Sequence, residues 1–324
     1  MLDLVARLGQ TPAGGLVDVP IEDADIPTVT QWCARTGNEL VAVSAGVARV
    51  RRGRTADPLA DIAPDRRPGA RLWLYTNFDC NLACDYCCSR SSPKAPRRAL
   101  GVRDVGRLVA EADAAGVLEM FLTGGEPFLL LDLDEIVATC TARLPTTLLT
   151  NGMLFHGRRL DMLRRMPRDR LTLQVSVDSA TPDQHDRHRG AGSWRRAMDG
   201  VRIAQAEGFR VRVATTVAPG EEADAAALRT LLDGLGIARP DQVVRPVAQR
   251  GFASDGVALT VETLLPEITV TADGVYWHPV GVDHPDLLVS RELFPFAAVV
   301  ATVRERFADY RRTAAAAAEL FPCA

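Results

Sequence analysis

The chain has 324 residues, 47% of them hydrophobic and 24% charged, which is enough for two domains or for one large α/β domain with an appendage. Its net charge of −3 gives no basic footprint for nucleic acid. No apolar run approaches the ~20 residues of a membrane-spanning helix, and residues 1–7 lack the regions of a secretory signal. We therefore expect a cytoplasmic protein with no nucleic-acid or membrane partner.

Residues 1–54 predict a small α/β module with a helix, a strand, a second helix beginning near Pro27, and two strands at 39–43 and 47–50. Residues 25–40 resemble the TusA-type sulfur carriers. That family carries its persulfide on a cysteine in a Cys-Pro pair before its first helix, a place that would lie before Met1 here. Either the start is late or the module has lost its thiol. Cys33, beside Trp32 in mid-helix, predicts buried packing.

Residues 55–70 are rich in Arg, Asp, Pro and Gly and predict a linker. From 71 to 250 the chain alternates near-continuous apolar strands with helices, which indicates a parallel sheet with right-handed crossovers. Six such units predict a partial (β/α)6 TIM-like barrel. The expected strands are 72–75, 117–122, 146–149, 171–177, 211–217 and 242–247. The expected helices are 102–115, 133–141, 158–165, 193–207 and 223–235.

Three cysteines, Cys80, Cys84 and Cys87, lie within eight residues. Thiolates are soft ligands that select zinc, copper(I) or iron–sulfur clusters. A structural zinc site needs a fourth ligand, and Cys88 is awkwardly adjacent. A bacterial ferredoxin run has two-residue gaps and a fourth cysteine before proline, unlike this loop. The spacing therefore favours a cluster with one iron left open, with a closed electron carrier or a binding scaffold as the non-enzymatic rival.

Polar and glycine-rich segments follow the later strands at their carboxyl ends, where barrel folds place their chemistry. They are residues 123–127, 150–152, 176–179, 215–217 and 245–246. Because five such ends join the cysteine loop at one edge, turn chemistry alone explains them poorly.

The cysteine loop and Gly124-Gly125-Glu126-Pro127 together resemble the radical S-adenosylmethionine (radical SAM) superfamily over residues 71–250. The resemblance implies a [4Fe–4S] cluster on the three cysteines, with S-adenosylmethionine (SAM) on the fourth iron. One electron, from a flavodoxin- or ferredoxin-type donor, would cleave SAM to a 5′-deoxyadenosyl radical that abstracts hydrogen from the substrate.

The same resemblance implies a set of SAM contacts. Glycines allow close backbone approach, an aromatic ring offers a face near adenine, polar side chains can bond ribose, and an arginine can pair with the carboxylate. The expected residues are Tyr86, Gly124, Gly125, Glu126, Asn151, Ser176, Asp178 and Arg189, with Thr215 as a weaker candidate. Residues 150–152 are also consistent with a plain turn, and Ser176 or Asp178 with a helix cap.

Residues 251–324 predict strands at 259–261 and 268–271, a turn at 271–274 and a final helix at 296–320. Residues 268–276 resemble the SPASM or twitch extensions of this superfamily. Those extensions carry several cysteines, whereas here His278 stands at the first such place and Cys323 alone follows. We therefore expect a degenerate lid and a single cluster. The catalytic residues stay open, with Cys323, His278 and Arg245 as candidates.

These features predict a radical SAM enzyme that acts on a small organic substrate in a specialised biosynthetic pathway. The sulfur-carrier-like module favours sulfur insertion, and epimerisation is another candidate net reaction. The alternative is maturation of a ribosomally made peptide. Relatives of that kind often have a winged-helix leader-binding module, which residues 1–54 do not resemble.

Overall fold

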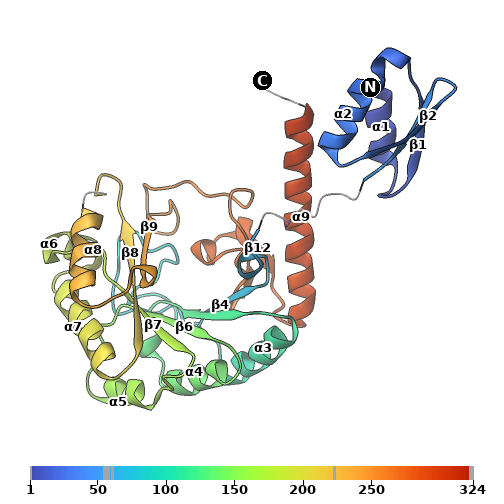
Figure 1. Ribbon diagram of the computed structural model, residues 1–324. Coiled ribbons are helices and arrows are strands. Elements are labelled where there is room, and N and C mark those ends of the chain that lie inside the picture. The colour runs from blue at the N-terminus through green and yellow to red at the C-terminus, as the bar shows by residue number, and fades with distance from the viewer. Residues whose placement is uncertain (1, 54–58, 60–61, 222–223, 321–324) are drawn as a thin grey trace. The chain divides into compact units, whose positions relative to one another are not determined.

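The computed structural model describes residues 2–53, 59, 62–221 and 224–320. The chain divides into two units, one formed by Met1–Ala63 with Arg311–Ala324 and one by Pro64–Tyr310. Figure 1 labels most of their helices and strands. Within the described ranges, no helix is both long and apolar enough to cross a bilayer.

The first unit contains a three-stranded antiparallel sheet in the order β1-β3-β2. Its elements are α1 (Leu2–Gln10), β1 (Leu16–Pro20), α2 (Ile26–Thr36), β2 (Glu39–Ser44) and β3 (Val47–Arg51). Alternate residues of β1 and β3 are buried in one core with apolar residues of both helices. Cys33 is 2% exposed in that core, which confirms its packing role. The resemblance to sulfur carriers stays a prediction.

Six parallel strands form the centre of the second unit, and the predicted partial barrel of strand–helix units is confirmed. The strands are β4 (Arg71–Tyr75), β5 (Glu119–Thr123), β6 (Thr146–Thr150), β7 (Leu171–Ser176), β8 (Arg210–Val217) and β9 (Gln242–Pro246). The helices are α3 (Val102–Ala114), α4 (Leu133–Thr141), α5 (Arg158–Arg165), α6 (Pro182–Arg189), α7 (Ser193–Ala206) and α8 (Asp224–Gly234). Figure 1 shows these helices along the outer face of the curved sheet.

The two faces of the central strands carry different residues, as strand alternation requires. Leu72 and Leu74 of β4 are fully buried, whereas Trp73, on the other face, stacks on Phe121 of β5 with 4.3 Å between ring centroids. Helix α6 was not among the predicted helices, because its sequence PDQHDRHR has no apolar period to detect.

The C-terminal strands extend the barrel sheet. These elements are β10 (Thr269–Thr271), β11 (Gly274–Tyr276), β12 (Leu288–Ser290) and α9 (Phe296–Leu320). Strand β10 lies parallel to β4, and β11 and β12 continue antiparallel, so the full order is β12-β11-β10-β4-β5-β6-β7-β8-β9.

The predicted strand at 259–261 is wrong. Its backbone makes a turn instead, in which the Thr260 N–H donates to Thr263 Oγ1 at 3.0 Å and that hydroxyl donates to the Thr260 carbonyl at 3.2 Å. A hydroxyl that bonds its own local backbone competes with strand pairing.

Candidate cofactor site

The three clustered cysteines lie on a loop that is closed by its own backbone. It leaves β4 at Thr76, and the Cys80 N–H donates to the Ser92 carbonyl at 3.2 Å, so its two arms are joined. The Cys87 N–H donates to the Cys84 carbonyl at 3.2 Å. All three cysteines are free thiols; Cys80 is buried and the other two are half-buried. The loop therefore holds three thiols together at the carboxyl end of β4.

The donors around these thiols fit an iron–sulfur cluster. The Leu82 N–H donates to Cys80 Sγ at 3.4 Å, and the Ser89 hydroxyl lies 3.5 Å from Cys87 Sγ. Hydrogen bonds to sulfur are a means by which proteins tune such clusters. Burial, followed by the nearby Glu126 charge, raises the pKa of Cys80 to about 12, and burial raises that of Cys84 to about 11. Binding iron would thus have to displace their protons.

A cubane also accounts for the spread of these ligands. In the described part of the chain, no three His, Cys, Asp or Glu side chains are grouped to hold a single metal ion. A cubane cluster does not require three ligands around one metal ion, because each thiolate binds a different iron.

The two glycines after β5 pack against the base of the cysteine loop. A Cβ on Gly124 would lie 2.4 Å from Asn77 Oδ1, and one on Gly125 would lie 2.1 Å from the Asp79 carbonyl oxygen. The Gly125 N–H donates to the Asn77 carbonyl at 2.9 Å. The sequence analysis explains these glycines by the close approach of their backbone to a ligand. The structure adds a second reason, which is that only a residue without a side chain fits against residues 77–79.

The Glu126 carboxylate is held by donors of the protein itself, and the predicted SAM contact of this residue stays a prediction. Its side chain is fully buried and accepts from the Thr150 hydroxyl at 2.7 Å, the Phe128 N–H at 3.0 Å and the Asn151 N–H at 2.8 Å. Burial raises the pKa of Glu126 despite these donors. The residue joins the β5 and β6 ends.

Asn77 was missed by the sequence reasoning. Its amide donates to the Glu126 carbonyl at 3.0 Å and to the Asp79 carbonyl at 2.9 Å. The available signal was a polar residue directly after an apolar strand and three residues before the first cysteine. Asn77 therefore links the cysteine loop to the end of β5.

Tyr86, Asp178 and Arg189 come together beneath the loop. Arg189 donates to Asp178 through Nε at 2.5 Å and Nη2 at 3.2 Å, and the Tyr86 hydroxyl donates to the same carboxylate. The Thr216 N–H adds a fourth donor at 3.0 Å. Burial would raise the pKa of Asp178, but Arg189 and these hydrogen bonds hold it below its ordinary value.

This arrangement gives Asp178 a positioning role within the protein. Four donors bond its carboxylate, which orients Tyr86 and Arg189, and its predicted contact with ribose stays a prediction. The Arg189 guanidinium lies 5.6 Å from the centre of the Tyr86 ring. The charged head of Arg189 and the aromatic face are thereby held in one place.

Helix α6, which carries Arg189, also contacts the loop through His188. His188 Nδ1 lies 2.9 Å from an Asp85 carboxylate oxygen, and its Nε2 lies 3.3 Å from Glu221. The Asp85 N–H donates to the His188 carbonyl at 3.2 Å. Burial would lower the pKa of His188, but the two carboxylates raise it overall. Sequence reasoning missed this contact, because the residues are 103 positions apart.

The remaining predicted contacts differ in their surroundings. The Asn151 amide donates to Asn81 Oδ1 at 2.8 Å, so Asn151 reaches the cysteine loop. Ser176 is half-buried, and its hydroxyl has no hydrogen-bond partner within the described chain. The sequence predicts that Thr215 faces the cleft. In the structure it is 1% exposed, and its hydroxyl donates to the Val177 carbonyl at 2.8 Å.

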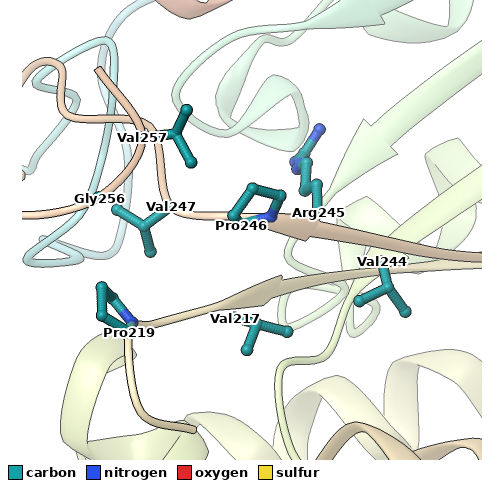
Figure 2. A pocket seen from close by; sticks show the side chains of 8 residues that line it. All are labelled: Val217, Pro219, Val244, Arg245, Pro246, Val247, Gly256 and Val257. Carbon is teal, nitrogen blue, oxygen red and sulfur yellow. The ribbon is translucent and has the colours of Figure 1, made fainter. Parts of the chain in front are cut away.

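A pocket of about 360 Å³ lies at the carboxyl ends of β8 and β9 (Figure 2). Its lining is Val217, Pro219, Val244, Arg245, Pro246, Val247, Gly256 and Val257. Arg245 is the charged member of this set, and Figure 2 shows its side chain on the opposite side of β9 from Val244. Burial lowers the pKa of His278 to about 4, and the Arg245 charge acts in the same direction. Cys323 lies outside the described residues.

Comparison with known proteins gives the class. The profile described as Radical SAM superfamily matches residues 74–232. An AdoMet-dependent heme synthase of Methanosarcina barkeri is 32% identical over 158 residues, 48% of this chain and 44% of the relative. The subtilosin biosynthesis protein AlbA of Bacillus subtilis is 32% identical, over 44% of this chain and 33% of the relative. The structure of anSMEcpe with bound AdoMet shares the fold, with a TM-score of 0.56, 12% identity, and coverage of 73% and 82% of the two chains.

Residues 74–232, just under half of the chain, form a radical SAM domain. Members of that superfamily are enzymes that bind a [4Fe–4S] cluster and SAM. The chain spans less than half the length of the curated relatives named above, so what the whole protein does is a separate question.

Proposed function

We propose that this chain is a radical SAM enzyme that abstracts hydrogen from an organic substrate held at the carboxyl edge of its partial barrel. The observation that carries the proposal is the closed loop of three free thiols seated on Gly124 and Gly125. When bound, the cluster supplies one electron to SAM and so produces the 5′-deoxyadenosyl radical that attacks the substrate.

The chain's own residues hold and shield that chemistry. Cys80, Cys84 and Cys87 would bind three irons. The proposed SAM contacts are Tyr86, Gly124, Gly125, Asn151, Ser176 and Arg189. Support comes from the open Ser176 hydroxyl and from Arg189, which Asp178 keeps charged and oriented. Glu126 and Asp178 are further proposed members of this set, and they also position their neighbours, because their carboxylates accept hydrogen bonds from the ends of other strands.

The substrate side supports a molecule with an apolar portion. The valines and prolines around the β8 and β9 ends line the pocket, and Arg245 can attract an anionic group nearby. We propose Arg245 and His278 as substrate-facing residues, with residues 251–324 as the lid. A small metabolite of a specialised pathway fits this volume, and sulfur insertion or epimerisation are the net reactions we favour.

A peptide is the second candidate substrate. It is favoured by the relative AlbA, whose name assigns it to biosynthesis of the bacteriocin subtilosin. We propose the cytoplasm as the location for either substrate, and residues 1–54 as an accessory module for carrying or recognising it.

The test is anaerobic reconstitution followed by reduction with dithionite in the presence of SAM. We expect 5′-deoxyadenosine from the wild type, and neither a stable cluster nor product from Cys84→Ala. Cys33→Ala, which removes a thiol from the separate N-terminal core, is the matched control and should retain both. An intact cluster, by iron and sulfide assay, that yields no 5′-deoxyadenosine would favour an electron carrier and contradict the proposal.

The same assay separates the two substrate classes. Candidate peptides and metabolites carrying deuterium are supplied in turn, and the true substrate should transfer deuterium into 5′-deoxyadenosine. Transfer from a peptide, with none from metabolites, would select the second candidate.

A further inference from the structure

A second groove, of about 600 Å³, lies beside the cysteine loop and is not part of the proposed substrate pocket. Cys80 lines this groove together with Asp79 and Asn81. Its other wall includes Leu129–Leu131, after β5. A molecule seated in the groove would thus be separated from the cluster by little more than a ligand side chain.

The groove is bordered by a basic segment. Residues 88–99 contain Arg90, Lys94, Arg97 and Arg98 and no acidic residue, although the chain as a whole carries −3. Arg90 lies 3.4 Å from Asp283, and Arg98 pairs with Asp273.

Two of these basic residues are available to bind an acidic surface of another protein. Lys94 and Arg97 are exposed, and neither has an acidic partner among the residues that the structure describes. Arg97 lines the groove, as does Arg159, whose Nε donates to the Phe128 carbonyl at 2.7 Å. Asp79 is the acidic lining residue, and it accepts from the Asn77 amide at 3.1 Å.

Apolar surface accompanies this charge. Leu131 is 89% exposed, and the lining also includes Pro93 and Ala95. A small apolar patch within a charged rim is typical of weak, transient redox complexes, in which electrostatics steer the encounter and contact areas are small.

We propose that this groove, bordered by Lys94, Arg97 and Leu131, is the docking surface for an acidic one-electron donor protein of the flavodoxin or ferredoxin class. The inference rests on the proposed function. The reduced donor loses one electron and the cluster gains it, and no bond forms or breaks. Cys80 lines the groove and would bind one iron, so it would give a covalent route from the groove to the cluster.

The test is the double charge reversal Lys94→Glu/Arg97→Glu. Oxidised flavodoxin is titrated into the cluster-free protein at low salt, where we expect about tenfold weaker binding than for the wild type. In the loaded protein, the bleaching of cluster absorbance by reduced flavodoxin should slow by a similar factor. Reduction by dithionite, a small reductant that needs no docking, should be unchanged. The wild-type advantage should shrink as salt screens the charges.

Arg195→Glu/Arg196→Glu is the matched control. These residues are exposed on α7 and make the same charge change outside the lining of the groove. The milder Lys94→Gln/Arg97→Gln should give an intermediate loss. Equal losses in the α7 control, or unchanged flavodoxin binding and cluster reduction, would overturn the docking surface. Loss of dithionite-driven reduction in both groove variants would also overturn it, since that places the residues in the cluster site itself. Failure of the proposed function would be seen in a different experiment, in which the wild type produces no 5′-deoxyadenosine from SAM with dithionite.

Discussion

Replacing Asp178 with asparagine tests the idea that this carboxylate organises the site from within the protein. Asp178 is 7% exposed and accepts from the Tyr86 hydroxyl, from two Arg189 nitrogens and from the Thr216 N–H. Asparagine keeps one acceptor oxygen but puts an NH2 group against a guanidinium. The substitution therefore removes the countercharge and sets donor against donor.

The size of the effect follows from burial. Arg189 is only 9% exposed, so without Asp178 its charge would be left uncompensated. Breaking such a buried pair by removing one partner costs about 3–5 kcal/mol. We expect a loss of about 3 kcal/mol in the free energy of unfolding, at the lower end of that range because asparagine retains part of the hydrogen bonding.

Urea unfolding of the cluster-free protein, under reducing conditions, measures this loss. Asp113→Asn is the control, because its pair with Arg143 spans 3.1 Å between half-exposed side chains and should contribute only ~0–1 kcal/mol. The double variant Asp178→Leu/Arg189→Met removes both charges and should recover more than half of the loss. Cluster content after reconstitution should fall in Asp178→Asn, since Tyr86 is released from its acceptor. A loss no larger than that of Asp113→Asn would refute the reasoning.

Three further changes probe the neighbouring contacts. Gly125→Ala would set its Cβ 2.1 Å from the Asp79 carbonyl oxygen and should lower both stability and cluster content. Gly106→Ala in α3 is the control, because its Cβ meets nothing closer than 3.9 Å and should stabilise the fold by about 1 kcal/mol. The thermal unfolding midpoints of the two variants should shift in opposite directions. Glu126→Gln should cost about 1–3 kcal/mol in urea unfolding, because a buried N–H loses its acceptor; a neutral result would contradict the buried network. Burial lowers the pKa of His185 from 6.5 to about 4, so the unfolded chain takes up that proton first. Stability should therefore fall as pH drops from about 6.5 to about 4, by at most about 3 kcal/mol from this group, and His185→Asn should show a smaller fall.

The sequence alone determined the class of the protein. Three thiols at fixed short spacing carry their chemistry in covalent order, so the loop could be identified without coordinates. The strand–helix alternation was equally readable, because apolar runs between polar helical faces are a local pattern. The same logic placed α9 at 296–320 and the buried Cys33. Sequence failed where there was no apolar period, as in α6, and where a threonine hydroxyl formed a turn at 260–263.

Only the tertiary structure decided which polar side chains already have hydrogen-bond partners within the protein. The carboxylates of Glu126 and Asp178 look like ligand groups in sequence, yet each accepts from a donor far along the chain. Thr150 lies 24 positions from Glu126, and Tyr86 lies 92 positions from Asp178. Such pairings depend on strand ends meeting at one edge, which no local pattern encodes. Among the residues that the structure describes, the same folding leaves Lys94 and Arg97 without acidic partners, while Arg98 pairs with Asp273. Residue spacing specifies what the loop can bind, but the strand ends that surround it decide which side chains can reach a ligand.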